Sequence, residues 1–135
     1  MRRTATGERG SVTVMTIGFL VVIGLLLAVV VNASSAYLQR QELANLTDGA
    51  ALAAADGLDE AAFYADRRIE LDPAESRDLV AGYLAGRDVA GVGVAVEGDV
   101  VSVRLERVVD LPFTPPGWPE RTRVSAEASS QLFRP

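Results

Sequence analysis

A long stretch of apolar residues without any charge lies near the start of the chain. No Asp, Glu, Lys or Arg lies between Arg9 and Arg40, and the residues from Met15 to Val31 are almost all aliphatic. A helix that crosses the hydrocarbon core of a bilayer needs about 20 apolar residues. Inside lipid every backbone amide must be hydrogen-bonded within the segment. We therefore predict one continuous transmembrane helix over residues 11–36.

The helical pattern continues beyond this segment. Residues 37–57 include no proline and are rich in Ala, Leu, Gln and Glu, which are strong helix formers. Small and apolar residues recur there at steps of three and four, as on one face of a helix. These residues are Leu43, Leu46, Ala50, Ala53 and Ala54. We predict a helical stalk over 37–57 that ends at Gly57, after which Asp59 caps a short helix from Glu60 to about Ile69.

The first residues of a second short helix are clearer. Asp72 is suited to the N-cap, Pro73 to the first helical position and Glu75 to the first turn. We expect this helix to run to about Ala85 and to end at Gly86. One face of it should pack on the rest of the domain. That face comprises Ser76, Leu79, Val80, Tyr83 and Leu84.

Alternating residues then predict strands. Val101, Val103 and Leu105 alternate with polar residues, which is the period-two pattern of a strand with one wet face. Residues 109–113 and 121–132 repeat this alternation, whereas residues 91–96 are rich in Gly and Val. The sequence at 97–99 is that of a tight turn. We therefore predict an α+β fold. The long N-terminal helix continues into a domain with two short helices and a small antiparallel sheet of three or four strands.

The charges predict the orientation in the membrane. Arg2, Arg3 and Arg9 precede the apolar stretch with a single acid, Glu8, whereas the whole chain has a net charge of −5. Arginines beside a first apolar helix stay in the cytoplasm. We predict a cell-membrane protein with residues 1–10 in the cytoplasm and 58–135 as an extracytoplasmic domain. An acidic domain also argues against binding of nucleic acid.

The composition of the chain argues against most kinds of metal site and catalytic site. The chain has no His and no Cys, and so lacks the usual ligands of zinc, copper and haem. The acids Asp56, Asp59 and Glu60 lack the spacing of a calcium loop and are better explained as helix caps. No nucleophile has a base beside it in the sequence. We predict no metal, no cofactor and no enzymatic activity.

Several residues are candidates for contacts with other proteins. Gly24 and Ala28 have the small-xxx-small spacing with which transmembrane helices pack, so a homo-oligomer through this helix is one expectation. The alanine stripe of the stalk is a second candidate surface. Trp118 lies among three prolines, either as a contact point for a partner or in a rigid turn over the sheet edge. The candidate interface residues are Gly24, Ala28, Leu43, Leu46, Ala50, Ala53, Ala54 and Trp118.

The N-terminal third carries a recognisable order of motifs. An Arg9-Gly10 start leads into the apolar helix, and a segment with Tyr37, Arg40 and Leu43 follows before the alanine-rich 48–55. This order resembles TadE/TadG-like proteins, of the TadG-related type, from tight-adherence (Flp) pilus systems. The resemblance covers residues 9–56. It implies a pilin-like ectodomain on a membrane anchor, in a minor structural or accessory component of a Flp-type pilus or related secretion apparatus. The implied partners are the lipid bilayer and other pilus or secretion-system membrane proteins or pilins.

The alternatives for function differ in whether and where a peptidase cleaves the N-terminal segment. Pilin-like members of that family have Glu at the fifth position after the glycine that a prepilin peptidase reads, but here this position is Met15. We therefore expect the anchor to be retained. Cleavage by signal peptidase near Ala33 or Ala36 would instead release a secreted small binding domain. The apolar core is longer than the usual 7–15 residues of a signal peptide, which favours the anchor. A membrane-tethered enzyme is a third alternative.

Overall fold

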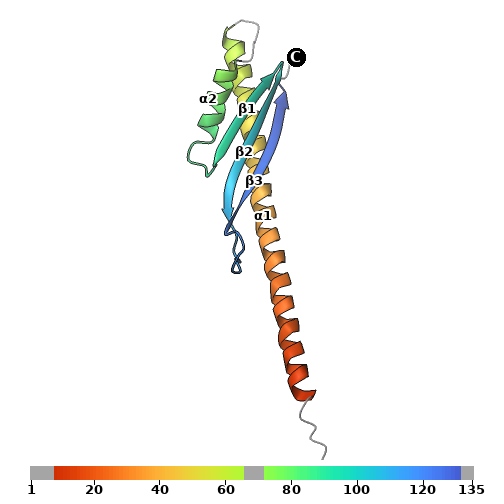
Figure 1. Cartoon of the computed structure of the whole chain (residues 1–135). Coiled ribbons are helices and arrows are strands. Elements are labelled where there is room, and N and C mark those ends of the chain that lie inside the picture. Colours follow the sequence, from red (N-terminus) through yellow and green to blue (C-terminus); the bar gives the residue numbers. More distant parts are fainter. Residues whose placement is uncertain (1–7, 66–71, 132–135) are drawn as a thin grey trace, which may run out of the picture.

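The fold is a long helix whose C-terminal half carries a second helix and a three-stranded sheet (Figure 1). The structure is a computed structural model and describes residues 8–65 and 72–131. Its elements are α1 (Glu8–Ala65), α2 (Pro73–Tyr83), β1 (Gly91–Glu97), β2 (Val100–Asp110) and β3 (Arg121–Gln131). The predicted α+β class, with a long apolar N-terminal helix and a small antiparallel sheet, is confirmed.

Helix α1 is unbroken over 58 residues, which corresponds to about 87 Å at 1.5 Å per residue. The predicted break at Gly57 is therefore wrong, and the part of the expected short helix up to Ala65 belongs to α1; its remainder, 66–69, lies outside the described residues. Gly57 has a packing role instead, because a Cβ atom there would lie 2.9 Å from Cδ2 of Leu79. The glycine lets α2 approach α1 closely.

Helix α2 begins at the predicted residues. Asp72 is the N-cap, and its Oδ1 accepts a hydrogen bond of 2.8 Å from the backbone N–H of Ala74. Pro73 occupies the first turn, where a missing N–H costs no helical hydrogen bond. The helix ends at Tyr83, and Gly86 follows with a left-handed φ of 76°.

The sheet is antiparallel in the order β1-β2-β3. Glu97 pairs with Val100, so the predicted tight turn is a two-residue hairpin loop, and Gly98 has the positive φ of 64° that such loops need. The residues of β2 alternate between buried and exposed as predicted. The stretch expected as a further strand, 109–113, instead completes β2 up to Asp110 and then enters the loop between β2 and β3.

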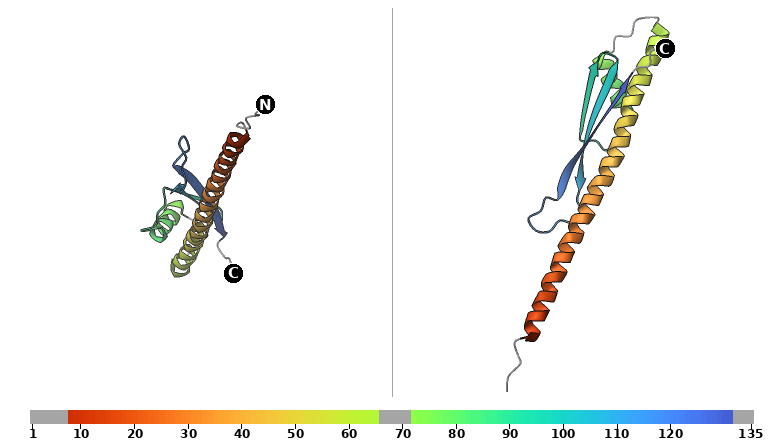
Figure 2. Two further views of the ribbon diagram at one scale, coloured as in Figure 1. Left: turned by 90° about the horizontal axis from the view of Figure 1, so that it is seen from below. Right: turned by 90° about the vertical axis from the view of Figure 1, so that its right-hand side faces the viewer.

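The core lies between the helices and one face of the sheet. Helix α1 packs on β2 and β3, while α2 packs on β1 and on α1 (Figures 1 and 2). The buried hydrophobic residues of this core are Leu43, Leu46, Ala50, Ala51, Ala54, Val80, Leu84, Val101, Val103, Leu105, Val109 and Val124. Within α1 they begin at Leu43, so the N-terminal half of that helix extends beyond the core (Figure 1).

Candidate functional site

The N-terminal half of α1 is a bare apolar surface. Large side chains such as Met15, Phe19 and Leu26 are more than half exposed all along it. A soluble surface rarely leaves so large an apolar area in water. Among the described residues, α1 is the one helix long and apolar enough to cross a membrane, and it lies near the N-terminus, where a signal sequence would have the same properties. The helix fits a single-pass membrane anchor.

The loop between β2 and β3 lies against α1 just beyond this bare surface. Asn32 of α1 donates from Nδ2 to the backbone oxygen of Phe113 over 2.5 Å and accepts at Oδ1 from the backbone N–H of Phe113 over 3.0 Å. We call these two bonds the Asn32–Phe113 pair. Asn32 is only 6% exposed, and Ala28, one helical turn earlier, is 7% exposed. The loop therefore meets α1 at the end of its apolar run.

The same loop has a defined shape. The N–H of Trp118 donates to the oxygen of Pro115 over 3.0 Å, with Pro116 and Gly117 between them. Gly117 has a φ of 88°, so the sequence and hydrogen bond are those of a type II turn. The base of the loop is closed by a hydrogen bond of 2.9 Å from Leu111 N to Glu120 O. From 111 to 119 no residue is charged, while Phe113 and Trp118 are 57% and 42% exposed.

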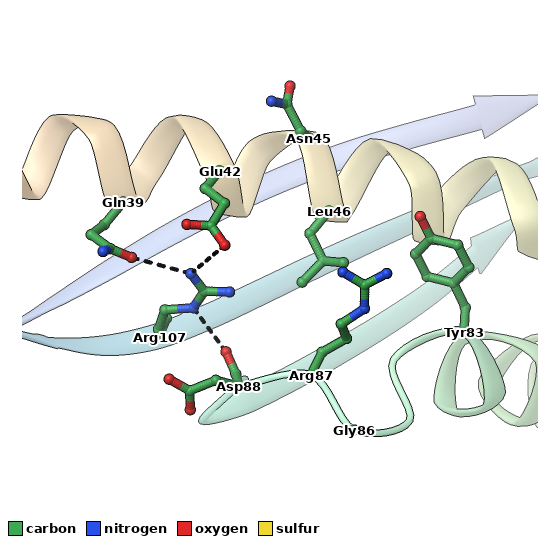
Figure 3. A pocket seen from close by; sticks show the side chains of 9 residues that line it. All are labelled: Gln39, Glu42, Asn45, Leu46, Tyr83, Gly86, Arg87, Asp88 and Arg107. Carbon is green, nitrogen blue, oxygen red and sulfur yellow. Dashed lines mark hydrogen bonds and ion pairs between the residues drawn. The ribbon is translucent and has the colours of Figure 1, made fainter.

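A second feature is a cleft of about 570 Å³ between α1, β2 and the segment after α2 (Figure 3). Arg107 of β2 lies in it and is buried. Its Nε donates to the oxygen of Asp88 over 2.8 Å, and its Nη1 donates to Oε1 of Gln39 over 3.2 Å and lies 3.5 Å from Oε1 of Glu42. These bonds tie the sheet to the stalk. The guanidinium is held by protein atoms, so we assign Arg107 a structural role.

The charges on the opposite face of β2 are exposed. Arg104 is bonded there to Glu127 of β3, and this hydrogen bond and ion pair raise the pKa of Arg104 above its ordinary value. An arginine is already protonated at neutral pH, so this shift has no chemical consequence. Among residues 8–65 and 72–131, no group of three or more acids could hold a metal ion.

The structure separates the candidate interface residues into two sets. The first set is buried in the core of the chain itself and has little or no surface left for a partner: Leu43, Leu46, Ala50 and Ala54. Ala28 is buried near the Asn32–Phe113 pair. The second set keeps exposed surface: Gly24, where a Cβ atom would meet nothing within 4 Å, the half-buried Ala53, and Trp118. For this second set an interface remains a prediction.

Two residues of these sites were not predicted from the sequence. Arg107 has the same strand parity as Val103 and Leu105, and this parity was the signal that it faces inward. Asn32 directly follows the aliphatic run in the sequence. Its partner Phe113 lies 81 positions further along the chain, so no local pattern connects the two.

These features define a class of protein: an α+β protein whose N-terminal helix fits a single-pass membrane anchor and continues without a break under a small sheet. Residues 10–57 match the family described as "Putative Flp pilus-assembly TadE/G-like". Over this segment the match supports the resemblance to TadE/TadG-like proteins that the order of N-terminal motifs indicated. It covers most of α1 and none of the sheet. No curated protein and no solved structure was found to match the chain.

Proposed function

We propose that the chain is a membrane-anchored minor structural or accessory component of a Flp-type pilus or a related secretion apparatus. The observation that carries this proposal is the family match over residues 10–57, because the family is described by its role in pilus assembly. The matched segment includes both the bare apolar half of α1 and the part that packs under the sheet. Deletion of the gene should reduce the number of surface pili, and the intact gene should restore them. Unchanged piliation would contradict the proposal.

The proposed topology places the N-terminus in the cytoplasm and the sheet outside. From Gly10 to Val31 the helix rises about 33 Å, close to the thickness of about 30 Å of a hydrocarbon core. The arginines Arg2, Arg3 and Arg9 precede this segment, and such residues stay on the cytoplasmic side. A reporter enzyme fused to the C-terminus should be active only outside the cytoplasm. Activity inside the cell would contradict this topology.

Retention of the anchor is the next part of the proposal. Helix α1 passes without interruption through residues 33–36, where signal peptidase would cut. The Asn32–Phe113 pair also joins the segment before these positions to the sheet domain. Mass spectrometry of the membrane fraction should find a mature protein that begins before Ser11. A start at Ser34 or Tyr37 would favour the secreted binding domain, and a start at Ser11 would make the chain a processed pilin-like protein.

The proposed partners are other membrane proteins of the same apparatus or pilins. Gly24 is a small, accessible position in the proposed span, where small residues let transmembrane helices approach closely. Ala53 is a half-buried small residue on the stalk. Replacing Gly24 by Leu should weaken crosslinks formed in membranes, including any homodimer. The matched control is Leu26→Ala, which changes an exposed side chain on the same half of the helix. Equal crosslinking in all three proteins would exclude Gly24 from the interface.

A further inference from the structure

We propose that residues 111–119 of the β2–β3 loop are a second membrane contact, which inserts Phe113 and Trp118 into the headgroup level of the outer leaflet beside α1. This inference rests on the proposed membrane anchoring of α1. It adds a binding surface for lipid in the part of the chain that the family match does not cover. The argument depends on where the loop lies, what it is made of and how rigidly it is held.

The depth of the loop follows from the Asn32–Phe113 pair. Asn32 comes directly after Val31, the last residue of the aliphatic run. If the hydrocarbon core of about 30 Å begins just after Arg9, it ends near Val31. Both backbone polar groups of Phe113 are bonded to the Asn32 side chain, so Phe113 lies at this boundary. In two views the loop is the part of the sheet domain that reaches furthest toward the N-terminal half of α1 (Figures 1 and 2).

The composition of the loop suits this depth. Residues 111–119 include Leu111, Phe113, Trp118 and three further prolines beside Pro112, and none is charged. The charges that flank this segment are Asp110 on one side and Glu120 and Arg121 on the other. Arg121 Nε lies 3.7 Å from Asp110 Oδ1. Tryptophan has an apolar ring and one N–H donor and prefers the membrane–water interface. An exposed pair of aromatic rings is therefore stabilised in the headgroup region.

A third aromatic residue, Tyr37 of α1, lies near the same depth in the membrane. Tyr37 is well exposed, and its hydroxyl accepts a hydrogen bond from Nε2 of Gln41 over 2.8 Å. It lies five residues beyond Asn32, or about 7.5 Å further from the hydrocarbon core. Tyrosine shares the preference of tryptophan for the interface. Tyr37, Phe113 and Trp118 would thus form an aromatic girdle built from two segments that are distant in the sequence.

The loop is preorganised for this contact. The type II turn at Pro115–Trp118 and the Asn32–Phe113 pair fix its backbone before any lipid is present. A rigid loop loses little conformational entropy when it enters the interface. A flexible loop would lose more. The lipid of the membrane that α1 crosses is the occupant we assign, since the loop is held directly beside the point where α1 enters that lipid.

The test uses Trp118, which is the single tryptophan of the chain. The full chain would be reconstituted into phosphatidylcholine vesicles that carry bromine at shallow or deep positions of the acyl chains. We expect blue-shifted Trp118 emission, stronger quenching by shallow than by deep bromine, and weak quenching by iodide on both sides of the membrane. Strong iodide quenching without bromine quenching would overturn the proposal. Protection from both quenchers would also overturn it, because it would indicate a protein contact.

The same samples distinguish this inference from the proposed function. Flotation of the vesicles after a carbonate wash reports whether α1 is inserted. If the chain does not float, the membrane anchor itself is contradicted. If it floats while Trp118 emits as in water, only the loop contact is contradicted.

Two variants test the role of Asn32. Asn32→Leu keeps an apolar helix but removes both bonds to Phe113, and we expect a red shift of Trp118 and loss of the difference between shallow and deep bromine. Ser34→Leu is the matched control, because it adds the same side chain at an exposed position two residues further on. It should leave the quenching unchanged. Unchanged quenching in Asn32→Leu would overturn the assignment of Asn32 as the residue that sets the depth of the loop.

Discussion

The two halves of α1 are one continuous helix in two different surroundings. Leu26 is 61% exposed in the N-terminal half, whereas Leu43 is 0% exposed under the sheet. The backbone hydrogen bonds are of the same kind in both halves, so the difference lies in what the side chains contact. The core half has its own sheet as a partner. In the bare half, residues 10–27 are all exposed, and so large an apolar surface calls for lipid or another helix.

The size of the side chains differs between the halves as well. The bare half has large aliphatic residues on all sides, which is typical of a helix surrounded by lipid. The core half presents mainly alanines to the sheet, with Ala50 and Ala54 fully buried. Small side chains let the strands lie close to the helix backbone. The buried positions of α1 under the sheet are therefore mostly small, with Leu43 and Leu46 as the large exceptions.

The strongest test of this comparison is the same substitution in both halves. Leu43→Ala should destabilise the domain by about 2–5 kcal/mol, because it leaves a cavity between α1 and the sheet. Leu26→Ala should leave the stability of the domain almost unchanged. Both proteins would be unfolded with denaturant in detergent micelles and followed by circular dichroism. Equal stability of the two variants would contradict the division of α1 into a core half and a bare half.

Neighbouring alanines sharpen the boundary between core and surface. Ala54→Leu should cost about 1–3 kcal/mol, because the extra atoms overpack the buried face. Ala53 is half-buried, so Ala53→Leu should change the melting temperature little and should weaken crosslinks to partners if that side is an interface. The measurements are thermal unfolding of the purified chain and crosslinking in membranes. If Ala53→Leu unfolds the domain as Ala54→Leu does, Ala53 belongs to the core.

The two arginines of β2 allow the buried face of the sheet to be compared with its exposed face. Arg107→Ala should destabilise the domain by about 1–3 kcal/mol, because it removes charged hydrogen bonds and leaves the oxygen of Asp88 without this donor. Arg104→Ala removes an exposed ion pair with Glu127 and should have little effect. Chemical denaturation of both variants measures the difference. A larger loss of stability in Arg104→Ala than in Arg107→Ala would show that the bonds of Arg107 do not hold the sheet to the stalk.

The smallest expected effect is at Gly49. A Cβ atom there would lie closer than van der Waals contact to the ring of Tyr83, which would have to move. Alanine favours a helix over glycine by about 0.5–1 kcal/mol. This gain opposes the cost of moving the Tyr83 ring, so Gly49→Ala should change the stability of the domain by less than about 1 kcal/mol. In the Tyr83→Ala background the clash is absent, and the same substitution should be stabilising. A double-mutant cycle that shows no coupling would contradict this contact.

The sequence predicted the features that depend on local chemistry. The N-cap at Asp72, the hairpin turn at Gly98 and the alternation of β2 were all confirmed, since each follows from residues close together in the chain. Gly57 was misread because its conformational freedom suggested a break, while contact with Leu79 explains the glycine and α1 stays helical there. The Asn32–Phe113 pair could not be predicted, because it depends on how the sheet docks on α1.

The continuity of α1 also fixes an angle. An α-helix turns about 100° per residue. The direction in which α1 faces the sheet is therefore fixed relative to the direction of every side chain in the bare half. Deleting one residue between Asn32 and Leu43 would swing the sheet around the helix axis by about 100° and would carry Phe113 away from Asn32. Removing seven residues would nearly restore the phase while shortening the rod by about 10 Å. Because α1 is unbroken, any rotation of the span about the helix axis turns the sheet by the same angle.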